Sequence, residues 1–344
     1  MVRLGAMGDI LHALPAVTAL RLAHPAWQID WVVEPRWRAL LESHASPDTA
    51  PIQPVVNQLH LAPTKQWRQN PLSSNTLNEI KSLRSTLRAG CYDAVIDLQG
   101  AIRSAVVGRL AGCRRLIGEA DPRERAARWL FTERILTRGA HVIEQDVELA
   151  SAIAGDPLTA VNPWLPVDPA AETWCDQVLP STNHQPAVLI NPGAGWGAKR
   201  WPVERYAAVA VALVDQGLSV FINAGPGEEP LAAAIAAASN GRALAIAPTL
   251  SQLIAFTRRI GLCIAGDTGP LHLACALRRP VVGIYGPTDP SRNGPFGTSF
   301  KVLRSPESRR DHTRHAEPEA GLLTIQPGEV LEAANQLLAL ETAP

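Results

Sequence analysis

The stretch LCIAGDTGPLH, residues 262–272, describes a strand end, a tight turn and the start of a helix. Residues 262–265 form a short apolar run typical of a buried strand, and Leu271 begins an apolar helical face. Pro270 suits a first helical turn, where its missing N–H is no loss. The free N–H groups and positive dipole end of such a helix favour phosphate. Taken alone, the segment is better explained as an ordinary turn capped by Asp267 or Thr268, but its neighbours change that interpretation.

Three further loops follow apolar strands in the same half of the chain. The loop NPGAGWGAKRWP, residues 191–202, has three glycines that let backbone approach a ligand, and Lys199 supplies a cation. It matches neither a Walker A loop nor a dinucleotide fingerprint, and a solvated surface loop is an equal alternative. In NAGPGEE, residues 223–229, Glu228 or Glu229 could accept hydrogen bonds from a ribose or simply favour a helix start. Together with GPTDP, residues 286–290, these loops should converge at one sheet edge and form a single ligand site.

Strand-like and helical segments alternate along the chain. Unbroken apolar strands in such an alternation predict an α/β fold with doubly wound parallel sheets covered by helices on both faces. The expected strands are residues 28–33, 94–98, 115–117, 187–191, 219–223, 243–246, 262–265 and 281–285, and the expected helices include 101–110, 203–215, 230–238 and 251–258.

The length of 344 residues favours two domains over one. Five prolines between Asn162 and Pro186 mark the natural junction, which also holds a possible helix around residues 171–178. We therefore expect a first domain at residues 1–165, a linker at 166–186 and a second domain at 187–326. A final helix at 327–344 has apolar positions at helical spacing.

The amino-acid composition of the chain argues against several classes of function. The 32 basic and 32 acidic residues cancel, so the overall charge gives no argument for nucleic acid as a partner. Five scattered cysteines without metal spacing fit a reduced, cytoplasmic compartment. No segment reads as a transmembrane helix, so any membrane contact should be peripheral. Hydrolase and metalloenzyme motifs are missing from the sequence, and we expect no metal site.

In the first half of the chain, the loop GAMGDILHALP, residues 5–15, begins almost at once. A loop of this kind normally follows a buried strand, so either the natural start lies upstream or the sheet tolerates a very short first strand. Asp9 is equally well explained as the N-cap of a helix beginning at Ile10 and as a catalytic base. Asp97 is better explained as a strand end that caps the next helix.

These motifs together resemble glycosyltransferase family 9, the ADP-heptose:lipopolysaccharide heptosyltransferases. The matching pieces are residues 5–15, YDAVIDLQG at 92–100, the 192–202 loop, 266–272 and YGPTDP at 285–290, in the family order and over nearly the whole chain. The heptosyltransferase I branch is the most similar. The resemblance implies a GT-B fold, in which two Rossmann-like domains face across a cleft and the C-terminal helix packs back on the first domain.

The resemblance also implies roles for individual residues. Asp9 matches the proposed base, and Lys199 matches the cation at the diphosphate. Donor-binding positions correspond to Gly195, where any contact would come from backbone, and to Glu228, Asp267, Thr268, Gly269 and His272. Acceptor binding is expected at Gly8 and in a basic region represented by Arg123, with Arg125 and Arg128 close by.

The function implied is inverting transfer of heptose from ADP-heptose to a Kdo or heptose residue of the lipopolysaccharide inner core. The acceptor would be a Kdo-bearing lipid A, and the enzyme would be cytoplasmic, with peripheral contact to the inner membrane. Because a lysine and helix dipoles can offset the phosphate charge, no cofactor or metal is required. The alternatives are a GT-B-like sugar-nucleotide epimerase, which would change the donor without an acceptor, and a non-catalytic nucleotide-sugar binding protein.

Overall fold

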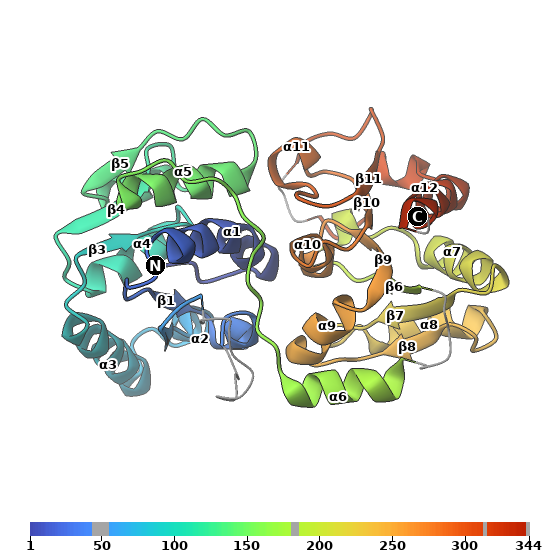
Figure 1. Cartoon of the computed structure of the whole chain (residues 1–344), viewed down its shortest axis with the longest axis horizontal. Helices are drawn as coiled ribbons and strands as arrows, with labels where there is room; N and C mark the ends of the chain where they lie inside the picture. The colour runs from blue at the N-terminus through green and yellow to red at the C-terminus, as the bar shows by residue number, and fades with distance from the viewer. Residues whose placement is uncertain (43–54, 180–185, 312–314, 342–344) are drawn as a thin grey trace. The chain divides into compact units, whose positions relative to one another are not determined.

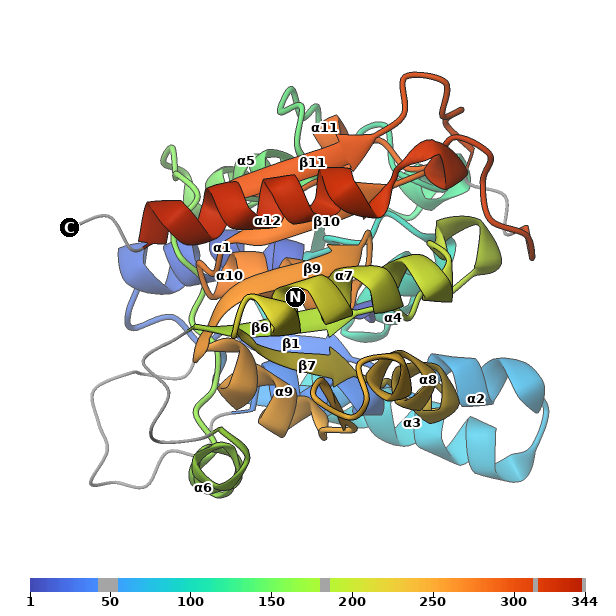
Figure 2. The same ribbon diagram turned by 90° about the vertical axis from the view of Figure 1, so that its right-hand side faces the viewer.

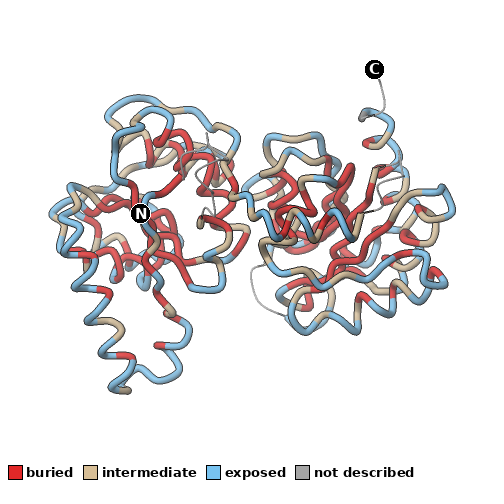
Figure 3. Tube along the Cα trace, turned by 60° about the horizontal axis from the view of Figure 1, so that its bottom comes forward, coloured by how far each residue is buried: buried red, intermediate tan, exposed pale blue. Residues whose placement is uncertain are grey.

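The computed structural model describes residues 1–42, 55–179, 186–311 and 315–341 and divides the chain into two compact units, Met1–Pro166 and Val167–Pro344 (Figure 1). In each unit the buried backbone runs through the centre and the exposed backbone surrounds it (Figure 3). Among the described residues, no helix is both long and apolar enough to cross a membrane.

The sheet of the first unit is organised by a segment too short to count as a full strand, Met1–Leu4. On one side Val2 N–H donates to the Ile96 carbonyl (2.9 Å), and on the other Val32 N–H donates to the Met1 carbonyl (2.9 Å). Parallel bridges from Val2 to Val32 and Asp97 give the order β2-β1-segment-β3-β4-β5. This sheet therefore has a very short first strand, which was one of the two alternatives left open by the sequence. The full strands are β1 (Asp30–Val33), β2 (Gln58–Leu61), β3 (Ala94–Ile96), β4 (Arg115–Glu119) and β5 (Glu133–Ile135).

Helices cover both faces of this sheet. Helices α1 and α5 pack against each other, and α5 also contacts β3 and β4. Helices α3 and α4 join a different core cluster that contains Val2, Leu4 and Val95, whose alternate spacing marks one face of the sheet. The helices are α1 (Met7–Ala23), α2 (Thr64–Gln69), α3 (Ser74–Ala89), α4 (Ile102–Leu110) and α5 (Val142–Ala154), with single 3-10 turns η1 (Pro35–Leu40) and η3 (Arg125–Trp129).

Three charged side chains are buried where α5 lies over this sheet. Arg3 is 6%, Asp97 1% and Asp146 3% exposed. Within the described ranges, the structure gives no hydrogen-bond partner to Arg3 Nε, Asp97 Oδ2 or Asp146 Oδ2. Burial raises the pKa of Asp146 to about 7; the Arg3 charge opposes the rise, and the carboxylates of Asp9, Glu119 and Asp97 add to it.

The second unit contains one six-stranded parallel sheet in the order β11-β10-β9-β6-β7-β8. Relabelled from its own first strand this is 6-5-4-1-2-3, the doubly wound order of dinucleotide-binding folds. The expectation of two doubly wound parallel-sheet domains is confirmed. The strands are β6 (Ala187–Asn191), β7 (Ser219–Asn223), β8 (Leu244–Ile246), β9 (Ile260–Gly266), β10 (Val281–Tyr285) and β11 (Phe300–Arg304); the helices are α6 (Pro169–Val178), α7 (Val203–Asp215), α8 (Glu229–Ala238), α9 (Leu250–Thr257), α10 (Gly269–Ala276), α11 (Pro290–Asn293) and α12 (Pro327–Glu341), with 3-10 turns η4 (Gly197–Lys199) and η5 (Leu322–Thr324).

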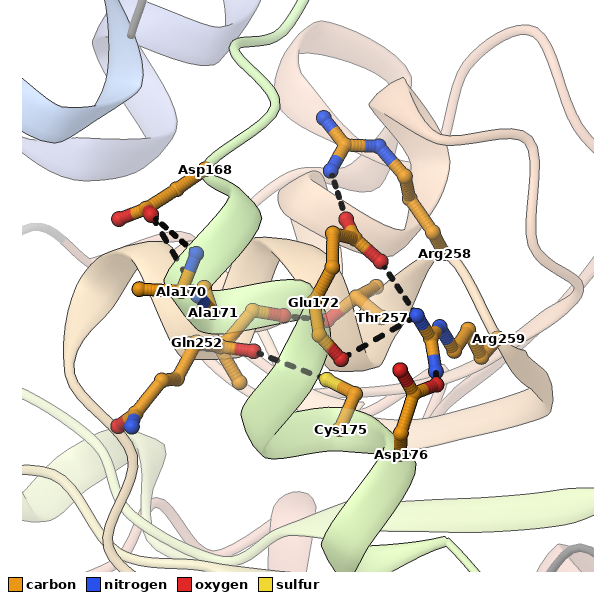
Figure 4. A network of polar contacts seen from close by, with 11 residues as sticks. Asp168, Ala170, Ala171, Glu172, Cys175, Asp176, Gln252, Thr257, Arg258 and Arg259 are labelled. Atoms are coloured by element: carbon orange, nitrogen blue, oxygen red, sulfur yellow. Dashed lines mark hydrogen bonds and ion pairs between the residues drawn. The ribbon is translucent and has the colours of Figure 1, made fainter.

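The expected linker, residues 166–186, contains an element of the second unit rather than a free connection. Helix α6 lies against α9, and its Glu172 carboxylate binds Arg258 (3.0 Å) and Arg259 (2.7 Å) (Figure 4). Asp176 also pairs with Arg259, at 2.5 Å. These ion pairs, together with buried Cys175, fasten α6 to the unit that follows it.

Helix α12 completes the core of the second unit, and its packing back on the first domain, which the resemblance implies, stays a prediction. It contacts α7, β9, β10 and β11, and Figure 2 shows it lying along the β10–β11 part of this sheet. The physical reason is its apolar face, which enters the same core cluster as β6 and α7. The α12 residues in that cluster are Val330, Ala333, Ala334 and Leu337.

We expect Leu337→Ala to lower the free energy of unfolding by about 2–5 kcal/mol, because it removes a buried side chain and leaves a cavity. Leu337 is 2% exposed, whereas Leu340 on the same helix is 65% exposed. The matched variant Leu340→Ala should change stability by less than about 0.5 kcal/mol. Urea unfolding of the two variants checks this, and equal effects would contradict the assignment of α12 to this core.

We expect Asp146→Asn to stabilise the protein increasingly as the pH rises from about 4 to about 7. An unfolded aspartate loses its proton near pH 4, whereas the folded Asp146 keeps its proton up to about pH 7, so ionisation of this residue opposes folding across that window. The gain should be on the order of 4 kcal/mol at pH 8, since each unit of pKa difference is worth about 1.4 kcal/mol, and should vanish near pH 4. Thermal unfolding against pH measures it, with the exposed Asp156→Asn as control; a pH-independent difference would contradict the prediction.

Candidate active site

The strand order fixes where each unit can bind a ligand. In a doubly wound sheet the ligand site lies beyond the carboxyl ends of the two neighbouring strands at which the order reverses. In the second unit these strands are β6 and β9, and the loops that follow them carry Lys199 and Asp267. In the first unit they are the Met1–Leu4 segment and β3, and the first of these leads into Asp9.

A buried ion pair joins the two loops of the second unit. Lys199 Nζ contacts Asp267 Oδ2 and donates to the Asp267 carbonyl (3.3 Å), while His272 Nε2 lies 3.0 Å from Asp267 Oδ1. The Asp267 side chain is only 5% exposed. Burial alone would raise the pKa of Asp267, but its hydrogen bond with His272 and the charge of Lys199 hold that pKa well below its usual range. Asp267 is therefore anionic and fixes the Lys199 ammonium at the strand ends.

Lys199 keeps capacity to bind a further group. An ammonium has three donors, and Asp267 takes up two of them. The ammonium also lies 5.0 Å from the centre of the Trp196 ring. Directly after Asp267, Thr268 is the N-cap of α10, so the N-terminus of this helix lies at the strand end, where an anion site would require it.

Amide side chains order the ends of β6 and β7. Asn191 Nδ2 donates to the Gly193 carbonyl (3.1 Å) and to Thr268 Oγ1 (3.3 Å), and Asn223 Nδ2 donates to Asn191 Oδ1 (2.6 Å). Both asparagines are buried at 3% exposure. This chain of hydrogen bonds ties three loops to one another.

Glu228 lies over the glycine-rich loop. Its carboxylate accepts a hydrogen bond from Gly225 N–H (3.1 Å), and a Cβ at Gly193 would meet Glu228 Oε2 at 2.0 Å. Gly193 is thus the position where the loop needs a glycine, whereas nothing lies within 4 Å of a Cβ built at Gly195. The fourth loop is also close, because a Cβ at Gly286 would lie 3.4 Å from the Ala198 carbonyl. The predicted convergence of four loops is confirmed.

The first unit places Asp9 in the first turn of α1. Asp9 Oδ2 accepts a hydrogen bond from Ala6 N–H (3.0 Å), and Arg3 Nη2 lies 3.6 Å from Asp9 Oδ1. The side chain remains 34% exposed. The helix begins at Met7 rather than at Ile10, so Asp9 is its third residue and holds the turn from inside. A carboxylate with two anchored oxygens and free lone pairs can still accept a proton.

The predicted acceptor residues lie at the same edge of the first sheet. Gly8 sits beside Asp9 in α1. Arg123 is exposed, and its backbone nitrogen would lie 3.1 Å from a Cβ at Gly100, the glycine that follows β3. Gln99 from the same loop accepts a hydrogen bond from Leu4 N–H (2.8 Å). No contact among the described residues joins Arg123 to Asp9 directly.

A cavity of about 80 Å³ lies at the opposite edge of this sheet. Its polar end holds Tyr92, whose hydroxyl donates to Asp30 Oδ2 (2.5 Å) and lies 2.8 Å from His60 Nε2. Asp30 and Ala94 begin β1 and β3, so the cavity is at the amino ends of the strands. Because ligands bind at the carboxyl ends, the cavity is separate from the candidate site.

Sequence reasoning missed several residues of the two sites. Arg3 contacts Asp9, and Asn191 and Asn223 order the loops that follow β6, β7 and β9. Thr288, 2% exposed, presents a hydroxyl without a partner in the part of the chain that the structure describes. The signal that could have found the asparagines is their place as polar residues at the last position of buried strands.

Comparison with known proteins gives a consistent family. The family model "Glycosyltransferase family 9 (heptosyltransferase)" matches residues 80–322. Lipopolysaccharide heptosyltransferase 1 of Escherichia coli K12 is 30% identical over 310 residues, which cover 89% of this chain and 93% of that protein. The corresponding protein of Pseudomonas aeruginosa is 29% identical over 313 residues, covering 89% and 83%.

Solved structures that are similar to this chain indicate the same family. The E. coli heptosyltransferase WaaC with ADP superposes with a TM-score of 0.79 at 27% identity, covering 98% of both chains. The predicted GT-B fold class is confirmed by such neighbours. The strand order, the loops at its reversal points and these similarities together establish that the chain belongs to glycosyltransferase family 9, the heptosyltransferases.

Proposed function

We propose that this enzyme transfers heptose from ADP-heptose to a Kdo or heptose residue of the lipopolysaccharide inner core, with inversion at the anomeric carbon. We place it in the cytoplasm, in peripheral contact with the inner membrane. The observation that carries the proposal is the buried Lys199–Asp267–His272 cluster at the point where the β6–β9 strand order reverses. The proposal is also supported by relatives of this chain at about 30% identity, which are heptosyltransferases.

The second unit would hold the donor. The third donor of the Lys199 ammonium is available for the diphosphate, and the N-terminus of α10 at Thr268 and Gly269 adds oriented N–H groups. Glu228 is the proposed ribose partner, because its carboxylate lies beside Gly193 in the loop that would approach the nucleotide. Backbone at Gly195 faces open space and can approach the donor closely.

The first unit would supply the base. As the acceptor oxygen forms its bond to the anomeric carbon, the bond from that carbon to the phosphate oxygen breaks and ADP leaves. The acceptor hydroxyl proton passes to Asp9, which Arg3 and Ala6 N–H hold in place. Gly8 and Arg123 are the proposed acceptor contacts. Lys199 and α10 would stabilise the charge on the leaving diphosphate, so the proposal includes no cofactor or metal.

The epimerase alternative is not favoured by these relatives. An epimerase would need further acid and base groups beside the sugar and would change ADP-heptose without an acceptor. Incubation of ADP-heptose with and without Kdo-bearing lipid A separates the three possibilities: mass spectrometry detects transfer, and NMR spectroscopy of the recovered donor detects epimerisation, which leaves its mass unchanged. Transfer appears only with acceptor, epimerisation appears without it, and a binding protein gives neither.

We expect Asp9→Asn to lower kcat by about 10²- to 10⁴-fold, because proton transfer by a positioned base contributes on that scale. Calorimetric ADP affinity should stay within about twofold, since the proposed donor residues belong to the other unit. Asp93→Asn changes an exposed aspartate at the amino end of β3 and serves as the matched control. An Asp9→Asn enzyme with normal kcat would exclude Asp9 as the base.

We expect Lys199→Met to weaken ADP binding at least about tenfold and to lower the melting temperature, because it leaves Asp267 buried without its cation. The double variant Lys199→Met/Asp267→Asn should recover most of the stability but not the affinity. Lys301→Met, on an exposed lysine of β11, is the control. If the double variant bound ADP as tightly as the wild type, Lys199 would be a structural residue only.

A further inference from the structure

Positive charge is concentrated in residues 101–140, although the whole chain is neutral. This stretch contains nine arginines and four carboxylates, a net charge of +5. It forms α4, β4, η3 and β5, which lie at one side of the first unit and end in the outermost strand of its sheet. Such asymmetry indicates an anionic partner for this surface rather than a requirement of folding.

Three of the four carboxylates are already occupied. Glu133 binds Arg115 through two contacts (2.7 and 3.0 Å), Glu119 accepts from the Thr137 hydroxyl (2.7 Å), and Glu124 accepts from Ile102 N–H (2.8 Å). Across the described residues, no carboxylate lies within ion-pair distance of the other arginines of this stretch. These are Arg103, Arg109, Arg114, Arg123, Arg125, Arg128, Arg134 and Arg138.

A large aromatic ring stands among these free cations. Trp129 is 67% exposed, with Arg128 4.8 Å and Arg134 5.6 Å from its ring centre. The two arginines hold the ring in place from neighbouring elements without covering it. An indole at an exposed position, flanked by cations, is the combination that favours the boundary between lipid and water.

Further apolar side chains extend the surface. Leu136 is 67% exposed and lies two residues after Arg134, on the same side of the extended chain. Ile102 and Val106 are 44% and 47% exposed, one turn apart on α4, which contacts η3. Long arginine side chains can keep their charged ends at the headgroups while the apolar residues between them enter the lipid.

We propose that this surface, centred on Trp129, Leu136, Arg128, Arg134 and Arg138, docks the enzyme on the anionic phospholipid face of a bilayer. The proposal rests on the proposed function, since an acceptor anchored in lipid must be reached from the bilayer surface. Leu136 and Arg138 follow the carboxyl end of β5, and in a parallel sheet that edge is also the edge of Asp9 and Arg123. The docking surface thus borders the proposed acceptor side of the first unit.

The test is flotation with vesicles of phosphatidylcholine alone and with about one third phosphatidylglycerol, the anionic lipid that should attract basic residues. The wild type should bind only the anionic vesicles, and about 0.5 M salt should weaken binding by screening. Arg134→Glu/Arg138→Glu should bind at least tenfold more weakly. Trp129→Ala/Leu136→Ser should weaken binding severalfold and remove the part that survives high salt.

A control variant tests whether vesicle binding depends on this surface or only on the net charge of the protein. Arg292→Glu/Lys301→Glu changes the total charge equally, on exposed residues of the second unit, and should bind anionic vesicles as the wild type does. Equal loss of binding in both double variants, or wild-type binding to neutral vesicles, would overturn the proposal. Absence of vesicle binding together with a shift in oligomeric state in Arg134→Glu/Arg138→Glu would identify a protein interface instead.

Turnover distinguishes failure of this proposal from failure of the proposed function. On an acceptor stripped of its acyl chains, Arg134→Glu/Arg138→Glu should turn over like the wild type. On the same acceptor sugars embedded in anionic vesicles, its turnover should fall at least tenfold. If the wild type transferred heptose to neither acceptor, the proposed function would be wrong, while the vesicle measurement would still decide the docking surface.

Discussion

Each unit is organised by one central strand segment that is hydrogen-bonded on both sides. This pairing also fixes the position of the proposed site residues in the loop that follows the segment. Met1–Leu4 is bonded to β1 on one side and β3 on the other, and β6 is bonded to β7 and β9. Because the strand order reverses at these segments, the loops that follow them open away from the helices. Asp9 and Lys199 stand at the same topological position in two separately built sheets. The positions of both proposed functional residues are thus a consequence of backbone pairing.

The two units differ in how well their buried carboxylates are paired. In the second unit, Asp267 is fully engaged by Lys199 and His272, so its charge is stabilised and the ammonium is held rigidly. In the first unit, the carboxylates of Asp97 and Asp146 share the neighbourhood of one guanidinium, Arg3, and each leaves an oxygen without a partner among the described residues. A buried cluster in which every charged group has a partner makes a site rigid, whereas a buried cluster with unpaired groups lowers the stability of the protein. The unfavourable cluster lies behind Asp9, where it keeps Arg3 in reach of that carboxylate.

The sequence predicted the central strands well because they are continuous apolar runs ending in polar residues; the bounds of β6, β7 and β10 match the expectation. It missed β2, β5 and β11, three outer strands that are half-exposed and therefore lack such a run. Convergence of the four loops of the second unit was predictable, since all parallel strands end at one edge. The contact of Arg3 with Asp9 and the burial of Asp146 were not, because they depend on how α5 packs against α1. The apolar face of α12 was visible, but periodicity does not say which sheet a helix covers.

The central position of Met1–Leu4 has a consequence for synthesis on the ribosome. This segment emerges before its partners, and β3 follows roughly 90 residues later, which at 5–20 residues per second is a delay of about 5–20 s. During that interval Val2 and Leu4 can pair with β1 but not with β3, and the α1 residues behind them, most of which are buried in the finished protein, lack the α5 helix that packs against them. The nascent chain therefore carries a long helix with many apolar residues unprotected for seconds, which makes it a natural client for ribosome-associated chaperones.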